Sequence, residues 1–205
     1  MQINKNIEVS VKCRIGLGKN FNYEFFEEFI EEILKSGVKV VYVHARNAIL
    51  NGISPKGNRT IPPLNYDFVH KIKSKFSSVT FVLNGGIDSI DKALELSKIY
   101  DGVMLGRLIQ NNPFCLKEVD RLFYNKTSKY IVSEKTIEDY FRFIKPKIGS
   151  DTIYRLLSPL LNIFFGIPDG KNFKIDIHEK MKENNFDKLE KIFLDFVEEK
   201  KIFIN

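Results

Sequence analysis

The stretch from residue 80 to residue 107 is the part of the sequence that most restricts the fold. It begins with a short apolar run at 80–83, rich in β-branched and aromatic residues, which stops at Asn84-Gly85-Gly86. After a segment with helical spacing of apolar residues, a second apolar run at 102–105 ends at Gly106-Arg107. This order of strand, glycine turn, helix and strand is typical of parallel βα units, whose turns lie together at one end of the sheet.

The preceding residues repeat the same alternation of strand and helix patterns. Strand patterns lie at 8–15 and 38–43, and helix patterns lie at 23–35 and 66–76. Strand starts recur about every 25–40 residues, which is the spacing of a parallel βα protein. A loop at 47–64, rich in glycine and proline, interrupts the alternation, and loops of this length within compact domains are usually functional.

After Arg107 the strand patterns cease, and apolar residues recur at helical spacing instead. The sequence therefore predicts an α/β fold in which a parallel βα part over residues 1–123 is followed by a helical domain over residues 124–205. The segment at 171–182 is polar and gives no clear pattern. The helical segments expected are 112–123, 133–144, 152–165 and 186–197.

The charge of the chain is mildly positive, since 32 Lys and Arg residues against 26 Asp and Glu residues give a net charge of +6. This balance permits a polyanionic partner but does not require one, because a merely solvated basic surface has the same composition. The opening residues resemble neither a signal peptide nor a transit peptide, and no apolar run approaches the length of a membrane span. We therefore expect a soluble, cytoplasmic protein without a membrane partner.

The residues expected at the carboxyl ends of the strands are mostly cationic. Taken singly, each has an ordinary structural interpretation, such as a surface ion pair for a lysine or a common turn for Asn-Gly-Gly. In a parallel βα sheet, however, these ends lie side by side and bind ligands. Together they contain no carboxylate and favour an anion, such as a phosphate, or an electron-rich ring. The set comprises Lys12, Arg14, His44, Arg46, Asn84, Gly85, Gly86, Gly106 and Arg107.

The two cysteines offer no evident catalytic group. Cys13 lies between Lys12 and Arg14, which would lower the pKa of a thiol, but strand alternation turns it away from both and toward the helix layer. We therefore interpret Cys13 as a core residue, and Cys115, on the apolar side of a helix pattern, as another. The cysteines and histidines have no metal-ligand spacing, so no metal site is predicted. The two cysteines form no disulfide framework, which suits a reducing compartment.

Several motifs resemble those of the tRNA-dihydrouridine synthases. They are VKCRIG at the first strand, VHAR followed by the loop NGISPKGNRTIPPL, VLNGGI, and DGVMLGR followed by Asn112-Pro113. The S-P-K-x-N-R-x-I-P-P-L loop is similar to that of the A subfamily in particular. The similarity is close over residues 8–125 and looser through SPLLNIFFGIPDGKNFK, which is similar to a segment of the family's helical domain.

This resemblance implies an FMN enzyme that reduces a uridine in the D-loop of tRNA to 5,6-dihydrouridine, with NADPH as the electron source. Carried over by motif, Lys12 would lie near the isoalloxazine ring and Arg14 near the uracil. The residues implied to hold FMN are Lys12, His44, Asn84, Gly86, Gly106 and Arg107. The last four of these would hold its phosphate. The residues implied to contact tRNA are Arg46, Lys56, Arg59, Lys171 and Lys174.

The resemblance also implies an incomplete barrel. The family has eight βα units, and those of this chain are similar to its second half, strands 5–8 of a TIM barrel. The family's catalytic cysteine belongs to the first half, and neither Cys13 nor Cys115 stands in that motif, so we expect the chain alone not to form dihydrouridine. Four strands cannot close a barrel, and two sheet edges without a neighbouring strand are therefore expected.

Three interpretations stay open at this point. The first is a synthase in which residues 1–123 form an FMN-binding half-barrel and residues 124–205 form a tRNA-contacting helical domain. If the enzyme is split, its partner is a separate chain that carries the N-terminal half-barrel. The second is a half-barrel that binds tRNA or phosphate without catalysis. The third is another FMN-dependent β/α-barrel oxidoreductase, against which the KCR and SPKGNR motifs argue.

Overall fold

The computed structural model describes residues 7–127, 134–183 and 185–202. Contacts within the chain divide it into two units, Met1–Gly106 and Arg107–Asn205. The functional division at residues 123 and 124 stays a prediction.

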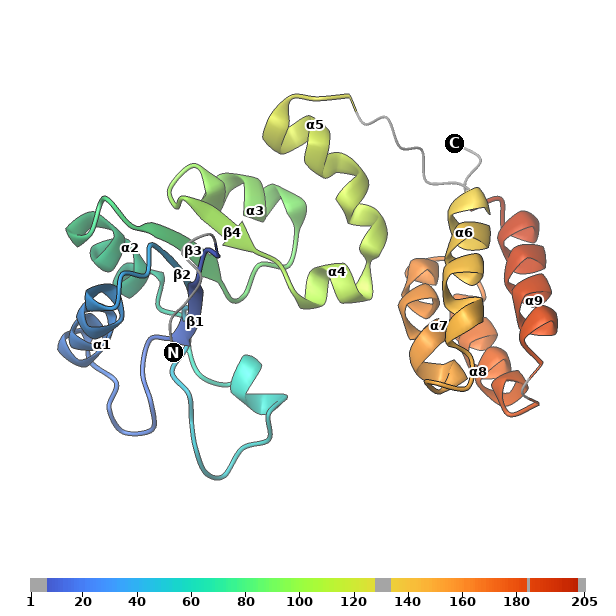
Figure 1. Ribbon diagram of the computed structural model, residues 1–205, viewed down its shortest axis with the longest axis horizontal. Coiled ribbons are helices and arrows are strands. Elements are labelled where there is room, and N and C mark those ends of the chain that lie inside the picture. The colour runs from blue at the N-terminus through green and yellow to red at the C-terminus, as the bar shows by residue number, and fades with distance from the viewer. Residues whose placement is uncertain (1–6, 128–133, 184, 203–205) are drawn as a thin grey trace. The chain divides into compact units, whose positions relative to one another are not determined.

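The first unit is built around a parallel sheet of four strands, as the strand spacing predicts. The strands are hydrogen-bonded to one another in chain order (Figure 1). Because parallel neighbours are joined only by crossover connections, the helices between them form a layer on the sheet. The strands are β1 (Ser10–Arg14), β2 (Val40–His44), β3 (Thr80–Asn84) and β4 (Gly102–Met104), and the helices are α1 (Tyr23–Lys35), α2 (Tyr66–Lys75) and α3 (Ile90–Ser97).

Each of these three helices begins with a polar side chain that caps its first turn. The side chain of Asn22 accepts a hydrogen bond from the backbone N–H of Phe25 at 2.8 Å, and Ser89 accepts one from the N–H of Lys92 at 3.1 Å. Asn65 caps α2 in the same way. The caps satisfy backbone donors that have no partner within the helix, and they therefore fix where each helix starts.

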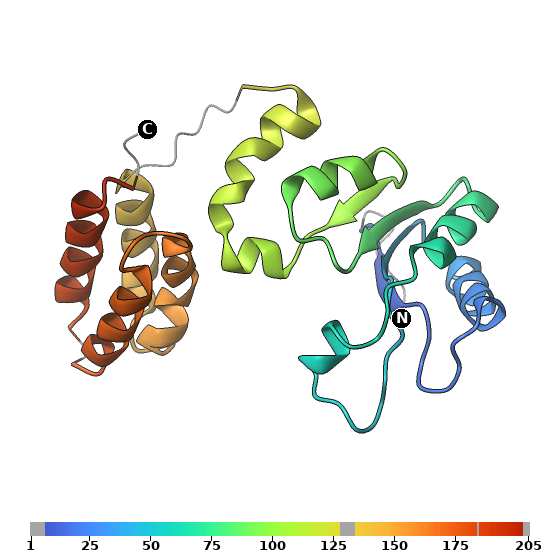
Figure 2. The same ribbon diagram turned by 180° about the vertical axis from the view of Figure 1, so that it is seen from behind.

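One face of the sheet forms the core of the first unit. Val41, Val43, Phe81 and Leu83 are fully buried there and pack against apolar side chains of α1 and α2, a layer that Figure 2 shows from behind. Burial of each such side chain contributes about 1.5–3 kcal/mol. Since successive side chains of a strand point to opposite faces, the residues that alternate with these four, such as His44, lie on the face away from the helices.

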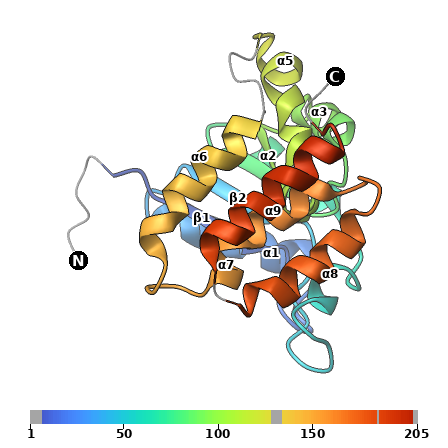
Figure 3. The same cartoon turned by 90° about the vertical axis from the view of Figure 1, so that its right-hand side faces the viewer.

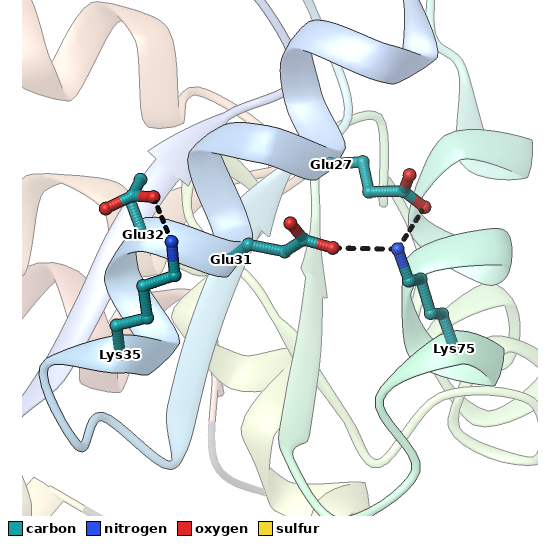
Figure 4. A network of polar contacts seen from close by, with 5 residues as sticks. All are labelled: Glu27, Glu31, Glu32, Lys35 and Lys75. Carbon is teal, nitrogen blue, oxygen red and sulfur yellow. Dashed lines mark hydrogen bonds and ion pairs between the residues drawn. The ribbon is translucent and has the colours of Figure 1, made fainter.

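Ion pairs on the surface connect α1 with α2 (Figure 4). Lys75 of α2 contacts two carboxylates of α1, Glu31 at 2.8 Å and Glu27 at 3.2 Å, while Lys35 and Glu32 pair within α1 at 2.5 Å. Solvent screens such exposed pairs, so their contribution to stability is small. The buried apolar face therefore holds the two helices on the sheet, and the ion pairs add a preference for this alignment.

The sheet has two open edges within the described residues. There β1 pairs only with β2, and β4 pairs only with β3. A hollow of about 250 Å³ lies beside β1 and is lined largely by apolar side chains, among them Phe25, Phe26 and Phe29 of α1. The expectation that four strands leave the barrel open is thus met by the described part of the chain.

The second unit is helical. Its first residues differ from the single helix expected over 112–123. A 3₁₀ helix at Pro113–Glu118, with proline at its first position, precedes the helix α5 (Val119–Tyr124). The helix α4 before it is not indicated by the sequence pattern. The elements of this part are α4 (Arg107–Asn111), the 3₁₀ helix and α5 (Val119–Tyr124).

The remaining helices of the second unit pack side by side around a phenylalanine-rich core (Figure 3). The polar segment left unassigned by the sequence is a helix, α8, and it forms because Phe173 and Ile177 turn one side of it into this core. The helices are α6 (Glu134–Ile144), α7 (Ile153–Leu161), α8 (Gly170–Met181) and α9 (Phe186–Glu199).

Phe193 of α9 lies at the centre of this core. Its side chain is fully buried, and its ring centroid lies 5.4 Å from that of Phe141, 5.8 Å from that of Phe164 and 5.3 Å from that of Phe173. Tilted and edge-to-face aromatic pairs at such distances add to the free energy of apolar burial. The high phenylalanine content of the chain therefore has a packing role in the second unit.

We predict that Phe193→Ala lowers the free energy of unfolding of the second unit by about 3–5 kcal/mol, because it removes a buried ring and leaves a cavity. Urea denaturation followed by circular dichroism measures the change. Phe165→Ala is the matched control, since that ring is 60% exposed and its removal should change stability by less than about 0.5 kcal/mol. Equal destabilisation by the two variants would contradict the assignment of the core.

Candidate functional site

The strand register brings three of the predicted site residues into one row. Arg14 of β1 is the register partner of His44 of β2, and His44 is the partner of Asn84 of β3. Lys12 lies two residues before Arg14 in β1, beside Tyr42. All are on the face away from the helices, at or near the carboxyl ends of the strands, where parallel sheets bind ligands.

The turn after β3 depends on two glycines. Gly85 has a φ of +112° and Gly86 a φ of +67°, in the region that favours glycine. A Cβ atom on Gly85 would lie 2.5 Å from Cδ2 of His44, and one on Gly86 would lie 2.3 Å from Cδ1 of Leu64. The absence of side chains here lets the His44 ring, which is only 8% exposed, pack directly against the turn.

Polar side chains hold the carbonyl groups around this turn. Asn84 Nδ2 donates to the carbonyl oxygen of Met104 at 2.8 Å, which ties β3 to the end of β4. Tyr66 Oη donates to Gly85 O, and Lys92 Nζ donates to Gly86 O, both at 2.7 Å. Burial raises the pKa of Tyr66, which keeps its hydroxyl a donor.

Sequence reasoning missed Tyr66 and Lys92 as members of this site. Each stands in the first turn of a helix that follows a site segment, α2 after the long loop and α3 after the glycine turn. That position is the only sign in the sequence that these two residues belong to the site, and it is a weak one.

Gly106 and Arg107 follow β4 after one intervening residue, Leu105. A Cβ atom on Gly106 would meet nothing within 4 Å, so the backbone there is open to a ligand. Arg107 is the first residue of α4 and begins the second unit. The two residues are adjacent in the chain, and the role predicted for Arg107 at a phosphate stays a prediction.

Two arginines fasten the loop at 47–64 to the sheet. Arg14 Nη1 donates to the carbonyl oxygens of Asn47 and Asn58, both at 2.9 Å. Arg46 Nη1 donates to the carbonyl oxygens of Thr60, at 3.2 Å, and of Pro62. Each arginine bridges separate parts of the loop, so the loop has a defined shape with several internal partners.

Asn58 closes the same loop from within. Its Oδ1 accepts a hydrogen bond from the N–H of Ile49 at 2.8 Å, and its Nδ2 donates to the carbonyl oxygen of Ile49 at 2.7 Å. The 3₁₀ helix Gly57–Arg59 sits at this closure. Lys56, just before this helix, and Arg59, its last residue, are exposed, and their contact with tRNA stays a prediction. Sequence reasoning missed Asn58, whose role is to shape the loop.

The site is strongly positive. Burial lowers the pKa of Arg14, and the neighbouring charges of Arg46 and Arg59 lower it further. These neighbours are both cations, so three arginines share one region at the carboxyl end of β1 and β2. Such a cluster is favourable for binding an anion, because a bound phosphate relieves the repulsion among the guanidinium groups.

The structure shows how its surroundings affect the pKa of Cys13, which lies between Lys12 and Arg14 in the sequence. Burial raises the pKa of Cys13 to about 12, and the smaller effect of Lys12, which lowers it, does not offset this. Cys13 packs against the core of the first unit, so its interpretation as a core residue is confirmed. Cys115 differs from the prediction: it is half-buried in the 3₁₀ helix of the second unit, because that segment does not continue as the expected regular helix.

Two kinds of feature are absent from the described ranges 7–127, 134–183 and 185–202. No group of three or more His, Cys, Asp or Glu side chains is placed to hold a metal ion. No helix there has both the length and the apolar character needed to cross a bilayer.

The second unit carries the remaining predicted residues on α8. Lys171 is exposed and Lys174 is half-buried, one helical turn apart. Neither forms an ion pair with the part of the chain that the structure describes. Cations without such partners are available to a phosphate backbone.

The chain is similar to known proteins over most of its length. A family profile described as dihydrouridine synthase (Dus) matches residues 1–199. A tRNA-dihydrouridine(20/20a) synthase of Yersinia pestis is 35% identical over 175 residues, which are 84% of this chain and 51% of that protein. The synthase of the same name from Shewanella oneidensis is 33% identical over 180 residues, 87% of this chain and 54% of the relative. The chain thus spans about half the length of these curated relatives, and it belongs to the dihydrouridine synthase family.

Proposed function

We propose that this chain carries the FMN-binding half-barrel and the tRNA-contacting helical domain of a tRNA-dihydrouridine synthase. The reaction is the reduction of a D-loop uridine of tRNA to 5,6-dihydrouridine, with NADPH as the electron source. The observation that supports it best is the row of Arg14, His44 and Asn84 beside a glycine turn, in a chain of this family. On this proposal the strands correspond to strands 5–8 of a TIM barrel within residues 1–123, and the helical domain covers 124–205.

The strand-end residues fit a flavin phosphate. They offer cationic and hydrogen-bonding groups, and the backbone at Gly106 has open space into which a ligand can approach closely. FMN, when bound, supplies the hydride that reduces the uracil ring. Lys12, as a positive charge, favours the reduced and anionic form of the flavin. The residues proposed to hold FMN are Lys12, His44, Asn84, Gly86, Gly106 and Arg107.

The cationic loop and α8 fit the tRNA. Arg14 lies in the row beside His44 and is assigned to the uracil, in addition to its contacts with the loop. Arg46 orders the loop from its base. Phosphates of tRNA attract such cations with an affinity that falls steeply with salt. The residues proposed to contact the tRNA backbone are Arg46, Lys56, Arg59, Lys171 and Lys174.

We also propose that the open edge of β1 pairs with the remaining strands of the barrel, supplied elsewhere in a polypeptide or by a separate chain. The apolar hollow at Phe25 and Phe29 supports this, because such a surface beside an unpaired edge is normally covered. Cys13 is half-buried, and desolvation raises the pKa of its thiol to about 12, so it does not suit protonation of a uracil. Formation of dihydrouridine is therefore expected only with those strands present.

A second candidate function follows from the same observation on Cys13. The chain by itself would then act as a module that binds tRNA or phosphate without catalysis. Uptake of FMN and tRNA without NADPH-dependent dihydrouridine formation supports this candidate. FMN uptake without any affinity for tRNA would favour another FMN-dependent β/α-barrel oxidoreductase.

We predict that Gly86→Ala raises the dissociation constant of FMN at least tenfold, because alanine at a positive φ is strained and its Cβ displaces Leu64 from the turn. Titration of FMN fluorescence with the purified chain measures the constant. Gly37→Ala is the matched control, since Gly37 has a φ of +89° but open space around it, and it precedes the amino end of β2, away from the carboxyl ends of the strands. Equal constants for the two variants, or no FMN uptake by the wild-type chain, would contradict the cofactor assignment.

We predict that the double variant Lys56→Ala, Arg59→Ala weakens binding of tRNA and reduces its salt dependence. Each lost phosphate contact should lower the slope of log K against log salt by about 0.7–0.9. Electrophoretic mobility shifts at several salt concentrations measure this slope. Lys39→Ala with Lys98→Ala removes the same charge from exposed positions away from the loop and should leave the slope nearly unchanged. If the two double variants have the same slope, the assignment of this loop to the tRNA-binding surface is wrong.

A further inference from the structure

An exposed pair of stacked rings lies next to the cations of α8. The ring of Tyr154, on α7, stacks on that of His178, on α8, with centroids 5.2 Å apart and an angle of 26° between the planes. Tyr154 is 53% exposed, and His178 is exposed as well. Stacked aromatic rings in the core of this unit have a packing role, but this pair lies at the surface.

Basic residues follow the same side of α8 as His178. Lys171, Lys174, His178 and Lys182 are separated by three or four residues, so they form a stripe along one face of the helix. Lys182 pairs with Glu179 at 2.7 Å. Lys171 and Lys174 make no ion pair with other described residues, so two cations of the stripe remain available to a ligand.

Two surface hollows have the ring pair in their walls. One, of about 500 Å³, is also lined by Thr152, Met181 and Lys182. The other includes Ser158 of α7 and Asn162, the residue that follows α7, together with Lys174. The second hollow therefore combines a flat aromatic surface, hydrogen-bonding groups and a cation. A nucleotide requires these three kinds of contact for its base plane, its base edge and its phosphate.

We propose that Tyr154 and His178 form a stacking platform for an unpaired base of the RNA substrate, with Lys171 and Lys174 holding the adjacent phosphates. This inference rests on the proposed function, since it adds a base contact to the tRNA surface of the second unit. Stacking is indifferent to base identity, because every base has a π-face. The platform accordingly contributes affinity and positioning, while selection of the uridine belongs to the first unit.

The test compares Tyr154→Ala, Tyr154→Phe and Phe143→Ala in the full chain. Tyr154→Ala should weaken binding of unfractionated tRNA about tenfold and leave the salt slope unchanged, because no charge is removed. Tyr154→Phe keeps the ring and should bind like the wild type. Phe143→Ala removes a ring from α6 that is 60% exposed, slightly more than Tyr154, and should have no effect on binding. Circular dichroism of each variant confirms that the helices are retained.

A second measurement separates stacking from a structural effect. A single-stranded RNA hexamer that contains 2-aminopurine should lose fluorescence on binding to the wild-type chain and to Tyr154→Phe, but not on binding to Tyr154→Ala. If wild-type chain binds tRNA and Tyr154→Ala binds it equally well, the platform is wrong while the proposed function stands. If the hexamer is quenched but tRNA does not bind, the platform stands and the tRNA function fails. If neither the hexamer nor tRNA binds, both the platform and the proposed function are wrong.

Discussion

The in-register parallel pairing of the strands is the constraint on which the rest of the first unit depends. Because side chains alternate along a strand, burying Val43 and Leu83 under the helices forces His44 and Asn84 onto the opposite face. Since neighbouring parallel strands run in the same direction, those residues also arrive at the same end of the sheet. Hydrophobic burial on one face thus assembles a polar row on the other, and no specific attraction among the polar residues is needed to bring them together.

A second consequence of that assembly is a concentration of positive charge. Arg14, Arg46 and Arg59 lie near enough to one another to affect the ionisation of Arg14. Such a cluster costs free energy in the unliganded protein, which the contacts of the arginines with loop carbonyls offset in part. The loop and the cations therefore support each other: the arginines shape the loop, and its carbonyls hold the arginines close together.

The sequence predicts the strands and helices of the first unit well because period-two and helical patterns directly reflect burial. The strand-end set is predictable for the same reason, and Arg14, His44 and Asn84 do lie in one row. Tyr66, Lys92 and Asn58 escape prediction, because their partners are backbone carbonyls that only the folded turn and loop bring within reach. The polar α8 escapes it as well, since only one narrow side of that helix is buried.

The way the arginines hold the loop has a consequence for its evolution. They bond to the carbonyl oxygens of Asn47, Asn58, Thr60 and Pro62, groups that every residue type possesses. Apart from Asn58, whose side chain closes the loop, those bonds do not depend on which side chains the loop displays. The loop can therefore exchange its outward residues between related proteins and keep its shape. Its specificity and its scaffold are free to change separately.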